Sequence, residues 1–197
     1  MALSKIVIAS GNEHKIAEIR AVLPASLELV SQRELAISEP PETGLTFVEN
    51  AIIKARNATR ESGLSAIADD SGLEVAALDG APGIYSSRYA GEDATDHDNN
   101  EKLLHALSHI PSEGRGAQFH CVIVFMRHER DPAPVIASGT LKGEIIQARR
   151  GSNGFGYDPL FLVPPLGKTV AELTSETKNQ ISHRALALAQ LKTLMSI

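Results

Sequence analysis

The chain has 197 residues, of which 43% are hydrophobic, and a formal net charge of -5. This length is sufficient for one domain with a substantial core, and we assign a single domain over residues 1–197. The acidic balance gives no overall attraction to a polyanion, so nucleic acid is not an expected partner. The only cysteine, Cys121, excludes an intrachain disulfide, and no signal peptide or membrane span is evident. We therefore expect a cytoplasmic protein without a membrane partner.

The first predicted elements are a strand over residues 5–10 and a helix over residues 16–23. The strand is apolar and β-branched, and the helix has apolar side chains at helical spacing before Pro24 ends it. Between them, Ser10-Gly11-Asn12 lies where backbone N–H groups and the helix dipole favour an anion, and Lys15 adds positive charge. The loop lacks the Walker pattern, so a phosphate site and an ordinary turn both remain open.

A second helix is predicted to begin at Thr46, because Thr46 and Glu49 form a capping box. It follows a Pro-rich loop over residues 38–44. Helical geometry returns Lys54 to the edge of the apolar stripe, with Asn50 one turn earlier. Lys54 either follows the core surface out to water or projects its ammonium into a cleft.

An acidic pair comes next along the chain. Residues 66–68 predict a short buried strand, and Asp69-Asp70-Ser71-Gly72 is predicted to end it as a turn. Because successive strand side chains point to opposite faces, only one carboxylate can enter a given cleft. Both aspartates can be turn residues. Alternatively, an aspartate and Glu42 supply the oxygen ligands that Mg²⁺ prefers.

The second half of the chain indicates a mixed α/β fold. A capping box predicts a helix from residue 95 to near residue 111, and residues 119–126 are apolar without alternation, as in a central strand covered on both faces. Two glycines interrupt residues 134–147, which suggests hairpin strands, and residues 182–195 have the spacing of a final helix.

Two further segments carry polar or aromatic groups. Residues 154–159 place Phe155 between two glycines, which allows its ring to stand clear of the backbone, although a tight turn with a packed ring is an equal alternative. Lys178, His183 and Arg184 can read keto oxygens or form a solvated polar face.

These segments, in this order, resemble the inosine triphosphate pyrophosphatase family, the XTP/dITP diphosphatases, over nearly the whole chain. The matching stretches are 10–12 with Lys15, 42–44 with 46–47, 49–51 with 54–55, 68–73, 81–83, 87–89, 154–159 and 182–184. The resemblance implies an elongated mixed sheet with flanking helices, two lobes around a central nucleotide cleft, and a homodimer. It also implies a Mg²⁺-dependent enzyme that hydrolyses ITP, dITP and XTP to monophosphate and pyrophosphate, which keeps these nucleotides out of DNA and RNA.

The resemblance further implies residue roles. It makes Asp70 the proton acceptor and a metal contact, Glu42 a second Mg²⁺ contact, and Asp69 a supporting acid. The triphosphate is expected on Lys54 and on the substrate loop Ser10, Gly11, Asn12, Glu13, His14 and Lys15, in which residues 13 and 14 vary among relatives. The base is expected on Phe155, with Gly156, Tyr157 and Asp158 completing the pocket, Lys178, His183 and Arg184 at the base edge, and Ser71 as a further substrate contact.

Two rival functions follow from the same residues. A pyrophosphatase for modified pyrimidine or methylated nucleotides needs a similar phosphate clamp but a different base pocket. A non-catalytic nucleotide sensor holds its ligand without turnover. The joint presence of Asp70, Glu42 and Lys54 argues against the sensor, because binding alone needs no water-activating base.

Overall fold

The computed structural model describes residues 5–196, so residues 1–4 and 197, which the predicted domain includes, lie outside the described part. The helices are α1 (Glu13–Val22), α2 (Phe47–Ser62), α3 (Asp96–Ala106), α4 (Ser175–Ile181) and α5 (His183–Met195). The strands are β1 (Ile6–Ile8), β2 (Leu29–Ser31), β3 (Ser65–Val75), β4 (Gly116–Met126), β5 (Val135–Ile145), β6 (Phe161–Val163) and β7 (Lys168–Thr169). Within residues 5–196, no helix is long and apolar enough to cross a membrane.

The described strands form one seven-stranded sheet in the order β2-β1-β3-β4-β5-β6-β7. Strand β1 is parallel to β2 and β3, whereas β6 is antiparallel to β5 and β7. The predicted mixed α/β fold with flanking helices is therefore confirmed. Strand β4 lies in the middle of the sheet, which confirms the prediction for residues 119–126.

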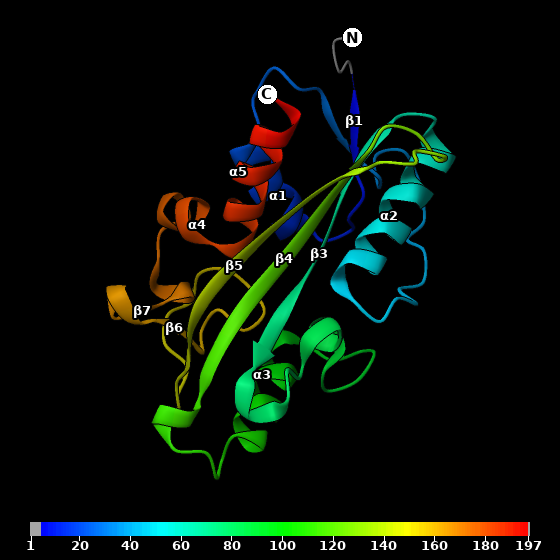
Figure 1. The fold of residues 1–197 in the computed structure, drawn as a ribbon. Helices are drawn as coiled ribbons and strands as arrows, with labels where there is room; N and C mark the ends of the chain where they lie inside the picture. Colours follow the sequence, from blue (N-terminus) through cyan, green and yellow to red (C-terminus); the bar gives the residue numbers. More distant parts are fainter. Residues whose placement is uncertain (1–4, 197) are drawn as a thin grey trace. The chain divides into compact units, whose positions relative to one another are not determined.

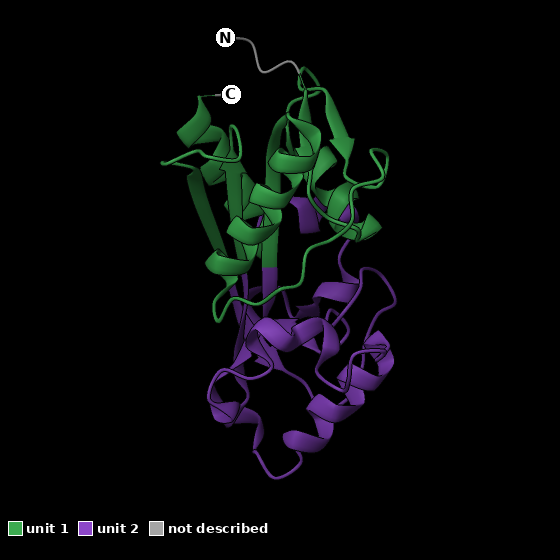
Figure 2. Cartoon of the chain, turned by 90° about the vertical axis from the view of Figure 1, so that its right-hand side faces the viewer, with its two compact units in different colours: residues 1–70, 121–139, 183–197 green, residues 71–120, 140–182 purple. Residues whose placement is uncertain are grey.

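The chain divides into two compact units, shown in Figure 2. Unit 1 comprises residues 1–70, 121–139 and 183–197, and unit 2 comprises residues 71–120 and 140–182. Strands β3, β4 and β5 each begin in one unit and end in the other. Both units are thus discontinuous in sequence, and the assignment of the whole chain to a single domain stays a prediction.

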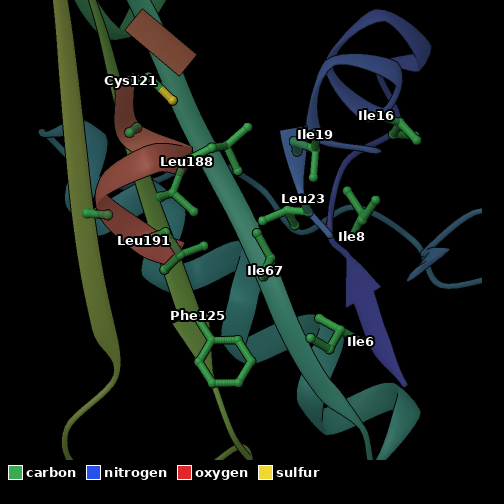
Figure 3. Packing of buried hydrophobic residues seen from close by; sticks show 13 residues of the cluster. Ile6, Ile8, Ile16, Ile19, Leu23, Ile67, Cys121, Phe125, Leu188 and Leu191 are labelled. Carbon is green, nitrogen blue, oxygen red and sulfur yellow. The ribbon is translucent and has the colours of Figure 1, made fainter. Parts of the chain in front are cut away.

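Unit 1 buries apolar side chains on both faces of its strands. Helices α1 and α5 cover one face, and α2 covers the other (Figure 1). The residues that face α1 and α5 include Ile8, Ile67 and Cys121, several of which are drawn in Figure 3. Cys121 is buried, as predicted, and this burial raises the pKa of its thiol to about 12.

The alternation of strand side chains decides where the acidic pair points. In β3, Ile67 packs on the α1 and α5 face, and Ala68 packs on the α2 face. Because successive side chains of a strand point to opposite faces, Asp69 lies on the same face as Ile67, and Asp70 lies on the same face as Ala68. The prediction that the two carboxylates face opposite ways is confirmed by their separate partners, described below.

The predicted turn at residues 69–72 is wrong, because β3 continues through it to Val75. Aspartate favours turns when its carboxylate bonds to the nearby backbone. Here Asp69 and Asp70 pair instead with side chains from helices, so the strand is not interrupted.

The predicted hairpin within residues 134–147 is also wrong, because β5 is one strand. A Cβ atom at Gly139 would lie 2.1 Å from the carbonyl oxygen of His183, and one at Gly143 would lie 2.3 Å from that of Leu162. These glycines therefore permit the close approach of α5 and β6 and do not form turns.

The capping signals located two helices correctly. Thr46 accepts a hydrogen bond from the backbone of Glu49 at the start of α2, and Gly63 ends that helix in the left-handed conformation. Thr95 begins α3 with a complete capping box. Helix α4 and strands β2, β6 and β7 were not predicted, because such short elements carry too few periodic residues.

Unit 2 has its own apolar core, which anchors the segment around Phe155. Leu73 of β3, Leu103 of α3 and Phe161 of β6 pack together with Tyr157 in this core. The hydroxyl of Tyr157 donates to the carbonyl oxygen of Ser86 at 2.8 Å. Tyr157 therefore fixes the turn that follows Phe155 to the core of unit 2.

Candidate active site

A buried charge cluster lies on the α2 face of unit 1. The Nζ atom of Lys54 is 2.7 Å from Oδ1 of Asp70 and 2.8 Å from Oε1 of Glu42. The side chains of Lys54 and Asp70 are 9% and 8% exposed. The structure thus brings together three of the predicted residues, and Lys54 does not extend along the core surface to water.

Asn50 connects this cluster to the loop before α2. It lies one helical turn before Lys54, so both side chains leave the same side of the helix. Its Nδ2 donates to Oδ2 of Asp70 at 3.3 Å, and its Oδ1 accepts from the backbone of Gly44 at 2.8 Å. The sequence placed Asn50 beside Lys54 but indicated no contact with Asp70.

Burial and charge set the protonation of the cluster. Burial lowers the pKa of Lys54, but the charges of Asp70, Asp69 and Glu42 outweigh it and hold that pKa above its ordinary value. Burial raises the pKa of Asp70, and the Lys54 ammonium opposes this without cancelling it. A carboxylate with a raised pKa is a stronger proton acceptor, as a general base requires.

Asp69 lies in a second ion network on the α1 and α5 face. Its Oδ2 accepts from Nη2 of Arg184 at 3.0 Å and lies 3.2 Å from Nζ of Lys15. Arg184 also pairs with Glu18 of α1. Burial raises the pKa of Asp69, but Lys15, Arg184 and Lys54 together hold it far below its usual value. A carboxylate held ionised in this way suits a supporting position more than proton donation.

This network changes the interpretation of Arg184. Its side chain is 1% exposed, and its guanidinium is engaged by Asp69 and Glu18. The Arg184 guanidinium therefore lies beside Asp69 on the α1 and α5 face, and this geometry does not support the predicted contact with the edge of a base. Sequence analysis did not indicate Glu18, because its partner Arg184 is 166 residues away in the chain.

The loop after β1, which is predicted to bind substrate, contains the N-cap of α1. Asn12 accepts from the backbone of His14 at 3.0 Å and of Lys15 at 3.2 Å, and Ser10 accepts from the backbone of Asn12. The Glu39 carboxylate accepts from the backbone of Gly11 at 2.5 Å. An anionic group thus already bonds to this loop, in keeping with a helix N-terminus.

Glu13 lies on the outer side of the same loop. Its carboxylate pairs with Arg33 at 3.2 Å, and both side chains are mainly exposed. Neither Glu39 nor Arg33 was indicated by the sequence, since the loop that contacts Gly11 and Glu13 follows β2, an element that was not predicted.

A separate group of predicted residues meets in unit 2. Oδ2 of Asp158 accepts from the backbone of Phe155 at 3.0 Å and from Nζ of Lys178 at 2.7 Å. The same Nζ lies 4.7 Å from the centre of the Phe155 ring. Lys178 belongs to α4, and its ammonium is therefore fixed beside the aromatic ring by a carboxylate and by a cation–π contact.

The predicted site residues accordingly fall into one set in each unit. Unit 1 holds Ser10, Gly11, Asn12, Glu13, His14, Lys15, Glu42, Lys54, Asp69, Asp70, His183 and Arg184, and unit 2 holds Ser71, Phe155, Gly156, Tyr157, Asp158 and Lys178. His183 begins α5 and is 7% exposed. The first set is rich in charged groups, and the second is built around an aromatic ring.

Comparison with known proteins gives consistent matches over nearly the whole chain. A model of the Ham1 family matches residues 6–194. The dITP/XTP pyrophosphatase of Yersinia pseudotuberculosis is 57% identical over 187 residues, which are 94% of this chain and 95% of that protein. The dITP/XTP pyrophosphatase of Escherichia coli O157:H7 is 53% identical over 96% of each chain.

Solved structures show the same similarity. The structure of a HAM1 protein from Coxiella burnetii superposes with a TM-score of 0.91 at 51% identity and covers 98% of each chain. The nucleoside-triphosphatase, or dITP/XTP pyrophosphatase, of Mycobacterium abscessus has a TM-score of 0.76 at 44% identity, over 95% of this chain and 98% of that one.

Proposed function

This chain belongs to the Ham1 family, and we propose that it hydrolyses non-canonical purine nucleoside triphosphates, namely ITP, dITP and XTP, to the monophosphate and pyrophosphate. The named substrates of the similar pyrophosphatases, dITP and XTP, support this assignment. Such an activity removes these nucleotides before they are incorporated into DNA and RNA.

The observation that carries the proposal is the cluster of Lys54, Asp70 and Glu42. One buried ammonium touches both carboxylates, and the pKa of Asp70 is raised. A site that only binds a nucleotide has no need of a buried carboxylate with increased basicity. We assign Asp70 as the group that accepts the proton of the attacking water.

The same two carboxylates fit a Mg²⁺ ion. Mg²⁺ is bound through one or two carboxylates and completes its coordination with water and substrate phosphates. Glu42 and Asp70 supply that number of carboxylates, and within residues 5–196 no group of three or more His, Cys, Asp or Glu side chains forms a fuller metal site. When bound, Mg²⁺ supplies positive charge that polarises a phosphate oxygen.

The residues of unit 1 account for the bond that is cut. Water deprotonated by Asp70 attacks the α-phosphorus, the bond from the α-phosphorus to the bridging oxygen breaks, and pyrophosphate leaves. The Lys54 ammonium stabilises the negative charge that develops on the phosphate oxygens. The remaining phosphates bind to Lys15 and to the backbone of the substrate loop. The N–H of Gly11 in this loop already donates to a carboxylate, and Lys15 already pairs with one.

The residues of unit 2 account for the base. We assign Phe155 as the stacking platform and Lys178 as the donor that meets the 6-keto oxygen of inosine and xanthine. Lys178 supports this role because its Nζ lies beside the Phe155 ring. Adenine has an amino group at that position, which cannot accept a hydrogen bond in place of the keto oxygen. Ser71 and His183 remain proposed substrate contacts.

Selectivity should need two filters. Lys178 rejects ATP but not GTP, which has the keto oxygen, so the 2-amino group of GTP must be rejected separately. A mismatch of buried polar groups discriminates by roughly ten-thousandfold or more, whereas a steric difference gives about ten- to two-hundredfold. ATP should therefore be excluded more strongly than GTP.

The test is the release of pyrophosphate from ITP, XTP, GTP and ATP, with and without Mg²⁺, compared as kcat/KM. Hydrolysis of ATP as fast as ITP would contradict the proposed function, and stronger rejection of GTP than of ATP would contradict the two filters. Modified pyrimidine and methylated nucleotides belong in the same panel, because a preference for them would favour the rival pyrophosphatase.

We also propose a cytoplasmic homodimer, on the basis of family resemblance. The single, buried cysteine supports a reducing compartment. Sedimentation equilibrium of the purified chain distinguishes a dimer from a monomer directly.

A further inference from the structure

The first turns of α3 hold both backbone polar groups of Gly156, the residue that follows Phe155. Oδ2 of Asp96 accepts from the Gly156 N–H at 2.6 Å, and Nδ2 of Asn100 donates to the Gly156 carbonyl at 2.8 Å. Gly156 has a φ of 60°, in the left-handed region that favours glycine. All of these residues belong to unit 2.

These bonds constrain the backbone on both sides of Phe155. The Phe155 N–H donates to Asp158, and the next peptide N–H, that of Gly156, donates to Asp96. Because a peptide unit is planar, fixing the Gly156 N–H also fixes the carbonyl of Phe155. The Phe155 ring therefore leaves a backbone whose two neighbouring peptide planes are held in place.

Asn100 is not explained by the stability of α3. It is fully buried, and its Oδ1 has no hydrogen-bond partner within residues 5–196. A buried polar atom without a partner is unfavourable, so an amide at this position needs a reason beyond filling space. Leu103 of α3 and Leu107, the C-cap of that helix, pack in the apolar core of unit 2. What Asn100 adds is its Nδ2, which bonds to the carbonyls of Gly156 and Asp96.

We propose that Asn100 and Asp96 are positioning residues that fix the Phe155 ring for stacking on the purine, an inference that rests on the proposed function of Phe155. Neither side chain touches the base in this assignment. They act through the backbone of Gly156, so they set the affinity for the base and leave the phosphate chemistry of unit 1 unchanged.

The experiment compares Asn100→Leu with Asn99→Leu. Asn99 is the neighbouring buried amide of α3, but it bonds to the backbone of Ser87 and Ala90 and has no hydrogen bond to residues 154–158. For Asn100→Leu we expect the KM for ITP to rise about tenfold, which corresponds to losing part of the affinity that base stacking supplies. The kcat should stay within about twofold of the wild-type value. Inhibition by inorganic triphosphate should be unchanged. Asn99→Leu should leave the KM for ITP near that of the wild type.

Asp96 provides a second variant that does not depend on a buried substitution, since its side chain is exposed. Asp96→Ala removes the acceptor for the Gly156 N–H and should raise the KM for ITP. Asp96→Asn retains an acceptor oxygen and should restore it. Thermal unfolding of every variant separates a shift in KM from a loss of folded protein.

The outcomes separate this inference from the proposed function. If Phe155→Ala raises the KM for ITP but Asn100→Leu and Asp96→Ala do not, the positioning roles are wrong and the stacking role stands. Equal shifts in Asn100→Leu and Asn99→Leu would also overturn the positioning role, because they indicate a general effect of α3. If Phe155→Ala leaves the KM unchanged, the stacking role itself is wrong.

Discussion

Asp70→Asn isolates the proposed proton acceptor. Asparagine has nearly the same shape, and its side-chain oxygen can still accept from the Lys54 ammonium, which lies 2.7 Å from Oδ1 of Asp70. It cannot take a proton from water. The substitution therefore removes the proton-accepting carboxylate and the acceptor for Nδ2 of Asn50, and it leaves the volume packed between β3 and α2 nearly unchanged.

The expected loss in kcat is about a hundredfold to ten-thousandfold, the usual contribution of a positioned base, or about 2.7 to 5.4 kcal/mol in activation free energy. The loss of stability should be smaller than the roughly 3 to 5 kcal/mol that an unpaired buried charge costs. The reason is that the Lys54 ammonium keeps Glu42 at 2.8 Å as a partner.

The assay is pyrophosphate release at saturating ITP and Mg²⁺, with binding of a non-hydrolysable inosine triphosphate analogue measured by calorimetry. Asp69→Asn is the matched control, because Asp69 is the adjacent residue but faces α1 and α5. It should lower the unfolding temperature more than Asp70→Asn does. A folded Asp70→Asn protein with near-normal kcat would remove Asp70 from the role of base.

Three further substitutions test the remaining assignments. Lys54→Ala should lower kcat/KM about a hundredfold or more, as for a lost oxyanion donor, and a match with Lys192→Ala in the same pyrophosphate assay would contradict this. Phe155→Ala should cost about 1 to 3 kcal/mol of affinity for inosine nucleotides, and calorimetry should show unchanged binding of inorganic triphosphate. Arg184→Met should lower the free energy of unfolding in urea by about 3 kcal/mol, because it removes the guanidinium that pairs with the buried Asp69 carboxylate. The pKa of Asp69 is depressed from 3.8, so the stability that its ion pair with Arg184 contributes is present above about pH 4 and is lost as the pH falls. A loss of unfolding free energy in Arg184→Met that did not vary with pH would refute this ion-pair role.

Much of the fold could be predicted because some signals are local. The capping residues Thr46 and Thr95 lie within one turn of the helices they begin, and the apolar run at residues 119–126 needs no partner to be recognised. The position of Lys54 at the edge of an apolar stripe follows from helical geometry alone. Short elements such as β6 and α4 carry too few residues for such signals.

The two wrong predictions have a common physical cause. Asp69 to Gly72 and the glycines of β5 have the local chemistry of turns, yet both segments are strands. Local propensity is a weak preference, and contacts from distant segments override it. In β3 these contacts are ion pairs with α1, α2 and α5, and in β5 they are the backbones of α5 and β6.

By itself, the sequence determined the fold class through the periodicity of its apolar residues, and the family through the resemblance of several short segments in order. Only the tertiary structure decided which residues contact one another. Arg184 bonds to Asp69, 115 residues earlier in the chain, and Asn100 bonds to Gly156, 56 residues later. No local pattern encodes such a pairing, because it exists only once the sheet and its helices have brought distant segments together.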